Sequence, residues 1–367
     1  MRVLVCPDKF RGTLTARQAA EAIERGWLRE RPHDTVELVP LADGGEGTLD
    51  VLVPADASDA RRMTSSVTGP LGDRVQAEFG VRGNVGVVEM ARASGLHLVS
   101  PARLDPLRAT TRGTGELMAA AIAAGVHRLL VCLGGSATND AGVGMAAAIG
   151  GRFLDAAGRI VRDGGAALLD LVRIDVTDVA AAVSAIDVVG VTDVDNPLCG
   201  PTGASAVFGP QKGASADEVM LLDRALAHTA AVAARDLGAD RSEEPGAGAA
   251  GGLGFGLLAF CGGRLRPGVE VVMDAVGFIE RLERADLVIT GEGAFDEQSL
   301  RGKVPAGVIR AAELAGVPRT VLCGVASVAV AGVTVRSLVE LVGPDAALAD
   351  APRALEALAA SASREAG

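Results

Sequence analysis

The chain has 367 residues, enough for two or three domains, and its 49% hydrophobic and 22% charged residues predict a globular protein with an ample core. A net charge of −11, one Trp and no Tyr argue against a nucleic-acid partner, which would need a basic surface and aromatic stacking platforms. Five cysteines without a CxxC motif or a Cys/His cluster predict reduced thiols in a cytoplasmic protein. The first residues are interpreted as a strand rather than a signal peptide, and no membrane span is expected.

Short apolar runs alternate with amphipathic segments along the chain, which is typical of α/β proteins. The runs are continuously apolar, as expected for parallel strands that are buried on both faces. A different pattern at 74–89, where apolar and polar residues alternate and Gly stands at the turns, predicts antiparallel strands. The predicted parallel strands are 2–6, 35–39, 128–133, 186–192, 285–290 and 319–323.

Helices are predicted where apolar residues recur at helical spacing and a capping residue precedes them. Thr15 is a candidate N-cap for one, Ser215 with Glu218 forms a capping box for another, and Thr114 is interpreted as the cap of a third. The uncharged stretch from Gly246 to Gly263 is interpreted as a glycine-rich loop that leads into a buried helix. The predicted helices are 15–30, 115–124, 216–235, 304–315 and 352–364.

Six glycine-rich segments that carry Asp, Glu, Asn or Lys follow predicted strands or begin helices. Ligands of α/β sheets gather at the carboxyl ends of strands, where such loops lie. Backbone N–H groups in these loops and at helix N-termini can hold phosphate. The segments are PDKFRGTL (7–14), ADGGEGT (42–48), GGSATNDAGVG (134–144), TDVDNPLCG (192–200), FGPQKGA (208–214) and TGEGAFDEQSLRGK (290–303).

Lysine is rare, and its placement is informative. Of the 35 Lys and Arg residues, only Lys9, Lys212 and Lys303 are lysines, and all three lie inside glycine-rich segments. An ammonium is a compact point charge suited to a phosphate oxygen, and the planar fork of Arg does not replace it freely. We therefore predict that these lysines bind phosphate or carboxylate groups. The alternative for each of them is a solvated loop position.

Acidic residues also follow the predicted strands, at Asp43, Glu46, Asp193, Asp195, Glu292 and Asp296. Carboxylate oxygens suit Mg²⁺, which binds one or two carboxylates together with substrate phosphates. One Asp could instead accept the proton of an attacking hydroxyl. For each acid the alternative is a helix cap or an Asx turn, and Asp140 is interpreted in that way. All four histidines lie outside the motifs, which argues against a Ser–His–Asp hydrolase or a His-ligated zinc site.

Taken together, the motifs resemble the bacterial glycerate kinase family, of the class related to glycerate 2-kinases. The resemblance extends from residue 1 to about residue 325. It implies ATP-dependent phosphorylation of D-glycerate to 2-phosphoglycerate, with Mg²⁺. The motifs that carry it occur in the family's order, and they are PDKFRGTL, ADGGEGT, TTRGTGEL, GGSATNDAG, DVDNPLCG, FGPQKGA, GAAGGLGFG and ADLVITGEGAFDEQSLRGK.

The resemblance also implies a two-domain α/β fold. Both chain ends, 1–67 and 270–367, are expected to form a flavodoxin-like domain with a parallel sheet. A second α/β domain, 68–269, is expected to be inserted between them, with the active site in the cleft. The strand at 128–133 could belong to either domain.

The resemblance implies catalytic roles for Asp193, Asp195, Lys9 and Lys303. Asp193 or Asp195 is expected to be the base or a metal ligand, and Asp296 is a further candidate metal ligand. Spacing alone does not separate base from metal ligand. The expected partners are ATP and D-glycerate, without nucleic acid or membrane, and the oligomeric state is left open. The candidate substrate- and nucleotide-binding residues are Asp8, Arg11, Asp43, Gly44, Gly45, Glu46, Gly134, Gly135, Ser136, Thr138, Asn139, Asn196, Lys212, Gly291, Glu292, Gly293, Gln298 and Ser299.

The sequence departs from the family pattern at two sites. Many members have Ser-Phe-Lys where this chain has Lys9-Phe10-Arg11, and many carry an aromatic residue at the position of Arg112. Arg112 could clamp a substrate carboxylate or tune the specificity toward another hydroxy acid. Two alternatives to a glycerate kinase follow: a kinase of another small hydroxy acid, and a non-catalytic module that senses a nucleotide or metabolite.

Overall fold

The computed structural model describes residues 1–10, 12–300 and 302–366, and it divides into two compact units. The first unit joins Met1–Leu52 to Pro267–Gly367, and the second consists of Val53–Arg266. Both expected domain boundaries fall inside elements, the first in β3 (Ala60–Thr68) and the second in α10 (Gly268–Val276). The structure moves the first boundary because β3 pairs along its whole length with β4 (Arg74–Arg82) of the second unit.

The first unit contains a five-stranded, fully parallel sheet in the order β15–β13–β11–β1–β2. Counted along this unit, the order is 2-1-3-4-5, which is that of flavodoxin-like folds. The structure confirms four predicted strands here, whereas β15 was missed because its sequence, TVRS, is not an apolar run. The strands are β1 (Arg2–Pro7), β2 (Thr35–Leu38), β11 (Leu287–Gly291), β13 (Arg319–Cys323) and β15 (Thr334–Ser337).

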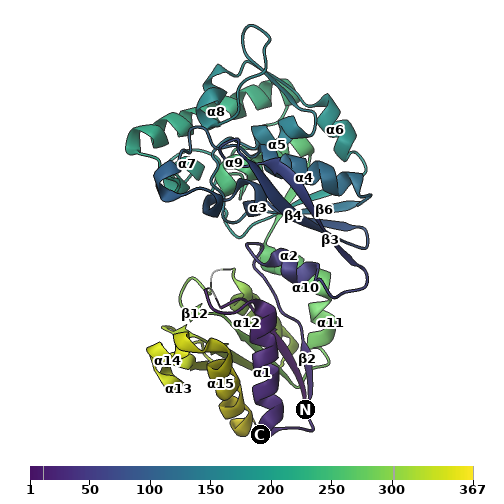
Figure 1. The fold of residues 1–367 in the computed structure, drawn as a ribbon, viewed down its shortest axis with the longest axis vertical. Helices are drawn as coiled ribbons and strands as arrows, with labels where there is room; N and C mark the ends of the chain where they lie inside the picture. The colour runs from purple at the N-terminus through teal and green to yellow at the C-terminus, as the bar shows by residue number, and fades with distance from the viewer. Residues whose placement is uncertain (11, 301, 367) are drawn as a thin grey trace. The chain divides into compact units, whose positions relative to one another are not determined.

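Helices cover both faces of this sheet. The purple α1 (Ala16–Glu30) and yellow α15 (Ala351–Glu365), which come from opposite ends of the chain, lie side by side (Figure 1). They approach so closely that a Cβ on Gly26 would lie 2.0 Å from the carbonyl oxygen of Glu356. On the other face, Ile309 of α12 (Val304–Ala315) packs against Val321 of β13. Burial on both faces explains why the central strands β1, β11 and β13 are mainly apolar.

Local sequence signals account for the ends of these helices. The N-cap predicted at Thr15 is confirmed, since its side chain accepts the N–H of Gln18, and Gln18 completes a capping box that was not predicted. The helices predicted at 304–315 and 352–364 are confirmed. The shorter elements of this unit are α2 (Thr48–Leu52), α11 (Phe278–Leu282), α13 (Leu338–Val342), α14 (Pro344–Ala349), and the paired β12 (Ala294–Phe295) and β14 (Val325–Ala326).

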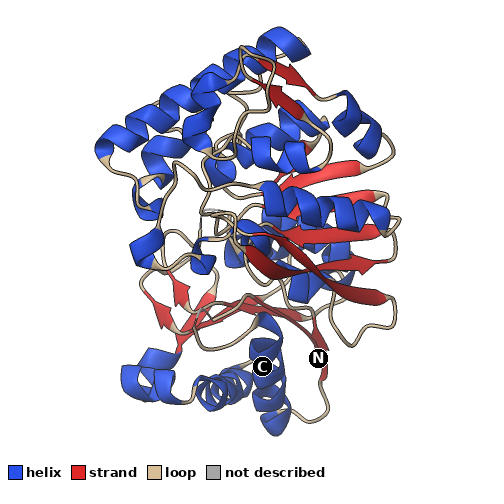
Figure 2. Ribbon diagram, turned by 45° about the horizontal axis from the view of Figure 1, so that its top comes forward, coloured by secondary structure: helices blue, strands red, loops and turns tan. Residues whose placement is uncertain are grey.

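The second unit contains a six-stranded mixed sheet in the order β10–β9–β6–β5–β4–β3. The antiparallel pairing predicted at 74–89 is confirmed between β4 and β5 (Val85–Glu89). From β5 onward the strands β6 (Arg128–Cys132), β9 (Asp187–Val191) and β10 (Arg264–Arg266) run parallel. The strand predicted at 128–133 therefore belongs to this unit. Figure 2 distinguishes the helices (blue) from the strands (red) of both units.

One predicted helix of the second unit is confirmed with its cap, and another starts earlier than predicted. α8 (Ala216–Leu237) has the expected Ser215–Glu218 capping box. α4 (Arg112–Ala123) starts earlier than predicted, and Thr114 is not its cap, because the Thr114 hydroxyl donates to Ser94 Oγ at 3.0 Å. The remaining elements are α3 (Ala91–Ser94), α5 (Val143–Ala148), β7 (Arg152–Leu154), β8 (Arg173–Asp175), α6 (Thr177–Val183), α7 (Ala204–Phe208) and α9 (Ala249–Cys261).

The glycine-rich start of α9 lies against the loop that follows β6. Gly251 has φ +68°, and a Cβ there would lie 1.9 Å from the carbonyl oxygen of Thr138. Only a residue without a side chain fits this approach, so the predicted glycine-rich entry into a buried helix is confirmed. Among the described residues, no helix is long and apolar enough to cross a membrane.

Candidate active site

Two acidic residues meet where β1 and β11 end in the first unit. Pro7 pairs with Gly291 in parallel register, so Asp8 and Glu292 follow neighbouring strands. The N–H of Asp8 donates to the carbonyl oxygen of Gly291 at 2.8 Å. The order of the sheet reverses between β1 and β11, and ligands of open α/β sheets bind at such a switch point.

The glycines of the TGEG motif let the chain pack closely beside β13. A Cβ on Gly291 would lie 1.9 Å from the carbonyl oxygen of Leu322, and a Cβ on Gly324 would lie 2.3 Å from that of Gly293. The N–H of Gly324 donates to the carbonyl oxygen of Glu292 at 3.0 Å. The backbone of these loops therefore holds Glu292 at the edge of the sheet.

A cavity of about 590 Å³ opens at this edge, and all of its lining residues belong to the first unit. The lining combines charged and polar side chains with apolar residues. The charged and polar side chains are those of Asp8, Lys9, Thr13, Asp43, Glu292, Asp296, Gln298 and Lys303. The apolar residues are Phe10, Val325, Leu338, Val339, Pro344, Ala347, Leu348 and Ala351, and Gly293, Ala294 and Gly324 complete the lining.

Asp8 carries the largest electrostatic perturbation in this cavity. Burial, and then the negative charge of Asp43, raise its pKa to about 7, against the opposing effects of Lys9. The N–H of Lys9 donates to Asp8 Oδ1 at 2.7 Å, and the Lys9 ammonium donates to the carbonyl oxygen of Glu46. The carboxylates at this edge outnumber the nearby ammonium groups, so the site favours a cation.

Glu292 and Lys303 form a loose ion pair across the same cavity. Lys303 Nζ lies 3.9 Å from Glu292 Oε2, and the Lys303 side chain is 32% exposed. Burial raises the pKa of Glu292, opposed by the Ser299 hydroxyl and the Lys303 ammonium. Glu292 is only 7% exposed, and its Oε1 atom has no hydrogen-bond partner among the described residues. A buried carboxylate oxygen without a partner is costly unless a ligand pairs with it.

The Asp296 carboxylate closes a tight turn at the rim of the cavity. Its Oδ1 accepts the N–H of Gln298 at 2.8 Å and that of Ser299 at 3.1 Å, which lowers the pKa of Asp296. This is the Asx-type arrangement weighed as the alternative to a metal ligand. Gln298 is exposed and Ser299 is buried.

The ADGGEGT loop follows β2 and contributes Asp43 to the lining of the cavity. Asp43 Oδ1 accepts the N–H of Gly45 at 3.1 Å, and Gly44 takes a positive φ of 84°. A Cβ on Gly268 would lie 1.9 Å from the carbonyl oxygen of Asp43, so α10 begins directly against this loop. Arg11, also predicted to bind a ligand, lies outside the described residues.

Asp193, Asp195 and Asn196 lie in the second unit, in the loop after β9. The two aspartates are exposed, and the Asn196 side-chain amide donates to the carbonyl oxygen of Thr202 at 2.8 Å. Asp296, grouped with them as a candidate metal ligand, belongs to the first unit. Within the part of the chain that the structure describes, no three His, Cys, Asp or Glu side chains form a ready-made metal site. The roles predicted for these aspartates remain predictions.

A buried lysine donates a hydrogen bond to the backbone of the GGSATND loop, which follows β6. Lys212 is 2% exposed and donates from Nζ to the carbonyl oxygen of Thr138 at 2.7 Å. Burial lowers the pKa of Lys212 to about 7, opposed by the charge of Asp140. The Asn139 side-chain amide donates to Ser205 Oγ at 3.1 Å. Thr138, Asn139 and Lys212 are thus engaged in hydrogen bonds within the second unit.

The first part of the same loop reaches the surface. Gly134 and Gly135 are exposed, and Gly135 has a positive φ of 75°. The carbonyl oxygen of Gly135 accepts the N–H of Leu96, and Ser136 forms a bridge with Gly95. Exposed glycine backbone at the carboxyl end of a strand suits a close approach by a ligand.

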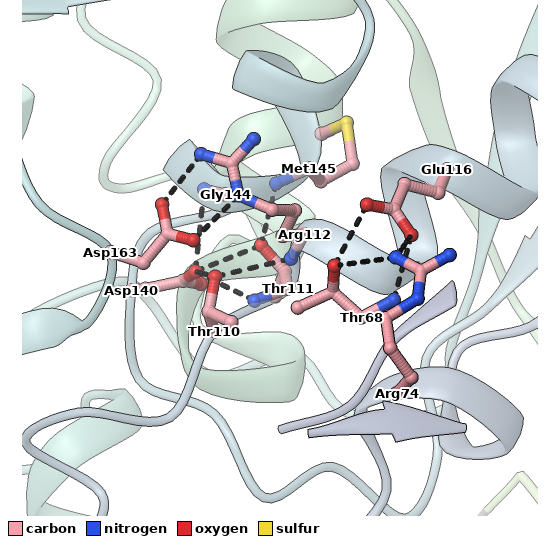
Figure 3. Close-up of polar contacts among 10 residues, drawn as sticks. All are labelled: Thr68, Arg74, Thr110, Thr111, Arg112, Glu116, Asp140, Gly144, Met145 and Asp163. Carbon is pink, nitrogen blue, oxygen red and sulfur yellow. Dashed lines mark hydrogen bonds and ion pairs between the residues drawn. The ribbon is translucent and has the colours of Figure 1, made fainter. Parts of the chain in front are cut away.

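Asp140 has a larger structural role than the predicted cap (Figure 3). Its Oδ2 accepts the Thr111 N–H at 2.8 Å and the Thr111 hydroxyl at 2.9 Å, and its two oxygens also accept the N–H groups of Gly142 and Gly144. Thr111 Oγ1 in turn accepts the N–H of Met145 at 2.9 Å. Asp140 therefore joins the start of α4 to the loop before α5. In the sequence, the only indication of this structural role was that Asp140 is the single acidic residue of TNDAGVG.

Two further contacts in this region involve the N-terminal half of α4 (Figure 3). The Arg112 guanidinium binds Asp163 through two hydrogen bonds of 2.6 and 2.7 Å, so this fork is already paired within the protein. The Glu116 carboxylate accepts both the N–H and the hydroxyl of Thr68, at 2.7 and 2.8 Å. These contacts attach α4 to the end of β3 and to the loop that precedes Gly164.

Sequence reasoning missed one charged pair at the carboxyl end of the second sheet. Glu89 ends β5 and is 2% exposed, and its Oε2 accepts a hydrogen bond from Arg92 Nε at 2.7 Å. Arg92 also donates to Glu78 Oε2 at 3.0 Å. Glu89 of β5 pairs in parallel register with Cys132, the last residue of β6 before the GGSATND loop. The acid at the end of an apolar strand was the signal that could have identified it.

Comparison with known proteins agrees with the sequence resemblance. The model of the glycerate kinase family matches residues 3–366. A glycerate kinase from Bacillus subtilis (strain 168) is 49% identical over 87% of this chain and 83% of its own length. A glycerate 2-kinase from Escherichia coli (strain K12) is 43% identical over 85% of this chain and 82% of its own length.

A solved structure gives the same result for the fold. The crystal structure of a proposed glycerate kinase 2 from Salmonella typhimurium LT2 superimposes with a TM-score of 0.89 at 42% sequence identity. That comparison covers 100% of this chain and 98% of the other. On the family match over nearly its whole length, and on relatives of this identity and coverage, the chain belongs to the glycerate kinase family.

Proposed function

We propose that this protein transfers the γ-phosphoryl group of ATP to the 2-hydroxyl of D-glycerate and releases 2-phosphoglycerate. Membership of a kinase family, with curated relatives at 43–49% identity, is the observation that carries the proposal. The name of the Escherichia coli relative supports phosphorylation at the 2-hydroxyl. The charged cavity at the switch point of the first sheet supports the phosphate-binding part of the reaction.

Lys9 and Lys303 are the proposed phosphate-neutralising groups. Phosphoryl transfer depends mainly on positioning and on neutralising the charge that spreads over the transferred group. Both lysines line the cavity, and neither ammonium is buried in the protein interior. The Lys303 ammonium lies close enough to Glu292 to be held in place and far enough to turn toward a phosphate oxygen.

The residues at this edge fit Mg²⁺. Glu292 presents a buried Oε1 atom without a partner among the described residues, and burial together with the charges of Asp43 and Glu292 raises the pKa of Asp8. Hard oxygen donors of this kind suit Mg²⁺, which needs one or two carboxylates in addition to phosphate oxygens. We propose Glu292 and Asp8 as ligands beside the predicted Asp296, with Asp193 and Asp195 as further candidates. The bound ion would neutralise phosphate charge.

Asp193 or Asp195 is the proposed base. Each is an exposed carboxylate in the loop that follows a buried parallel strand, where a substrate hydroxyl could reach it. The base would hold the proton of the attacking hydroxyl of D-glycerate while the phosphoryl group is transferred. The neighbouring exposed glycines, Gly134 and Gly135, are proposed to contact the same ligand through their backbone N–H groups.

The experiment that tests the proposal measures ATP-to-ADP turnover on D-glycerate, L-glycerate, glycolate, lactate and tartronate, with and without Mg²⁺. Preference for D-glycerate supports the proposal, whereas preference for another acid assigns a different hydroxy-acid kinase. ATP binding without turnover on any acid would assign a sensing module. An enolase-coupled assay without phosphoglycerate mutase identifies the product: a signal requires 2-phosphoglycerate, and silence with active turnover would contradict that regiochemistry.

A further inference from the structure

Part of the lining of the first unit's cavity is apolar, and the phosphates and the metal ion would not use it. We call the residues Phe10, Val325, Leu338, Val339, Ala347 and Leu348 the apolar wall. The same cavity is also lined by the charged side chains of Asp8, Lys9, Asp43, Glu292, Asp296 and Lys303. A ligand that fits the whole cavity must therefore have both a strongly charged part and a weakly polar part.

The size and chemistry of the cavity distinguish between the two substrates. Its volume of about 590 Å³ lies in the range of pockets that hold ligands of cofactor size. D-glycerate is a three-carbon acid that is polar at every carbon, so it would leave the apolar wall in contact with water. ATP has a polyanionic chain at one end and a flat, weakly polar base at the other, which matches the combination of charged and apolar residues in the lining.

Two large apolar side chains of the wall are exposed to solvent. Leu348 is 72% exposed and Val325 is 45% exposed, although both line the cavity. Exposed apolar residues that stand singly are ordinary, but here they converge on one concave surface next to charged groups. A nucleoside that covered them would gain roughly 25 cal/mol for each Å² of apolar surface removed from water.

Backbone hydrogen bonds connect the apolar wall to the charged part of the lining. The N–H of Val325 donates to the carbonyl oxygen of Gly293 at 3.0 Å, and the N–H of Val339 donates to that of Gly324 at 3.0 Å. The Ser337 side chain caps α13 by accepting the N–H of Glu340. The wall is therefore attached to the segment that carries Glu292, at a spacing set by the backbone.

We infer that the apolar wall is the nucleoside subsite of this enzyme, with the triphosphate directed toward Lys9 and Lys303. The inference rests on the proposed kinase function. It assigns nucleotide binding to the first unit, and specifically to the segment of α13 and α14. The base packs against aliphatic side chains, and the phosphates extend along the loops that follow β1 and β11.

The test uses the full-length protein with the double substitution Val325→Asn and Leu348→Asn. Asparagine removes apolar contact area but adds no charge, so the electrostatic attraction for phosphates is retained. We expect the KM for ATP to rise about 10-fold or more, and the KM for D-glycerate to change less than about two-fold. Leu314→Asn is the matched control, because Leu314 of α12 is 81% exposed and does not line the cavity.

Calorimetric titration separates the nucleoside from the phosphates without relying on turnover. The double variant should lose affinity for ATP but keep its affinity for inorganic triphosphate, whereas Leu314→Asn should keep both. Unchanged ATP affinity in the double variant, or a raised KM for D-glycerate alone, would overturn the inference. A wild-type protein that binds ATP but does not phosphorylate D-glycerate would contradict the proposed function and leave this test of the nucleoside subsite valid.

Discussion

Lys212 donates a hydrogen bond from Nζ to the backbone carbonyl oxygen of Thr138 over 2.7 Å, in the interior of the second unit. The two residues come from different glycine-rich motifs, and Lys212 is 2% exposed. The contact gives the lysine a structural role beneath the loop that follows β6. Its predicted role in binding a ligand remains a prediction, and the buried ammonium has a measurable consequence for stability.

Replacing Lys212 with Met should change how stability depends on pH. Burial lowers the pKa of this lysine from 10.5 to about 7 in the folded protein. Between these two values the unfolded chain holds a proton that the folded protein has lost, so the lysine's contribution to stability becomes more favourable as the pH rises. We expect the unfolding free energy of the wild type, minus that of Lys212→Met, to increase from pH 7 toward pH 10.5.

Urea denaturation at several pH values measures this difference. Lys212→Leu should show the same pH dependence, because neither substituted side chain titrates. A difference that stays constant over the whole range would mean that the ammonium is not destabilised by burial. Loss of the hydrogen bond to Thr138 shifts the difference in unfolding free energy by a constant amount, and it does not cause that difference to change with pH.

Removing Lys303 or Lys9 should reduce transition-state stabilisation. If each ammonium neutralises phosphate charge, Ala variants should lose roughly 3–4 kcal/mol, the scale of a single oxyanion-hole donor, which is a fall of about 100- to 1000-fold in kcat/KM. Arg variants should not restore activity, because a planar fork does not occupy the place of a compact ammonium. We expect the larger loss for Lys303, which precedes α12 and lies beside Glu292.

The control for these variants is Arg284→Ala. Arg284 is an exposed cation of the same unit that lines a separate hollow with Arg2 and Glu37. Steady-state kinetics with circular dichroism separates loss of activity from loss of fold. Arg variants as active as the wild type at both lysines would show that a compact ammonium is not required.

Asp193→Asn or Asp195→Asn should lower kcat by about 100-fold or more if that residue is the base or an essential metal ligand. Both side chains are exposed, so neither change should unfold the protein. Asp170→Asn, at another exposed aspartate of the second unit, is the matched control. Near-normal turnover in both variants would remove these aspartates from the mechanism.

Thr111→Val should destabilise the second unit more than Thr111→Ser. The Thr111 hydroxyl donates to Asp140 and accepts from the N–H of Met145, and both contacts are buried. Valine leaves the N–H of Met145 without its acceptor, at about 1–3 kcal/mol, and removes one of the hydrogen bonds that Asp140 accepts, while the bond from the Thr111 N–H remains. Serine keeps the hydroxyl and loses one buried methyl group, at about 1 kcal/mol. Equal unfolding free energies for the two variants in urea would contradict this role of the hydroxyl.

The enzyme should discriminate only weakly between ATP and GTP. The side chains of the apolar wall carry no hydrogen-bonding group, and an apolar surface rejects a polar analogue only weakly. We expect kcat/KM for the two nucleotides to differ by less than about 10-fold. Selectivity of about 100-fold or more would show that polar groups of the protein recognise the base.

The sequence by itself determined much of the secondary structure and the location of the ligand-binding edges. Parallel strands such as Leu287–Gly291 were predictable because burial on both faces requires continuously apolar residues. The N-cap at Thr15 and the capping box at Ser215 were predictable because each is completed within four consecutive residues. The acids and lysines of the first cavity were predictable because they lie in glycine-rich segments that follow strands or precede helices.

Only the tertiary structure decided how distant segments combine. Asp8 and Glu292 are far apart in sequence, and the register of β1 with β11 brings them together. β3 joins the second unit because β4 is its pairing partner, a choice that its own residues do not specify. The burial of Lys212 and the contacts of Asp140 with Thr110 and Thr111 depend on atoms supplied by other motifs. Local sequence encodes local hydrogen bonds and apolar patterns, whereas pairing and burial depend on the free energy of the whole packed chain.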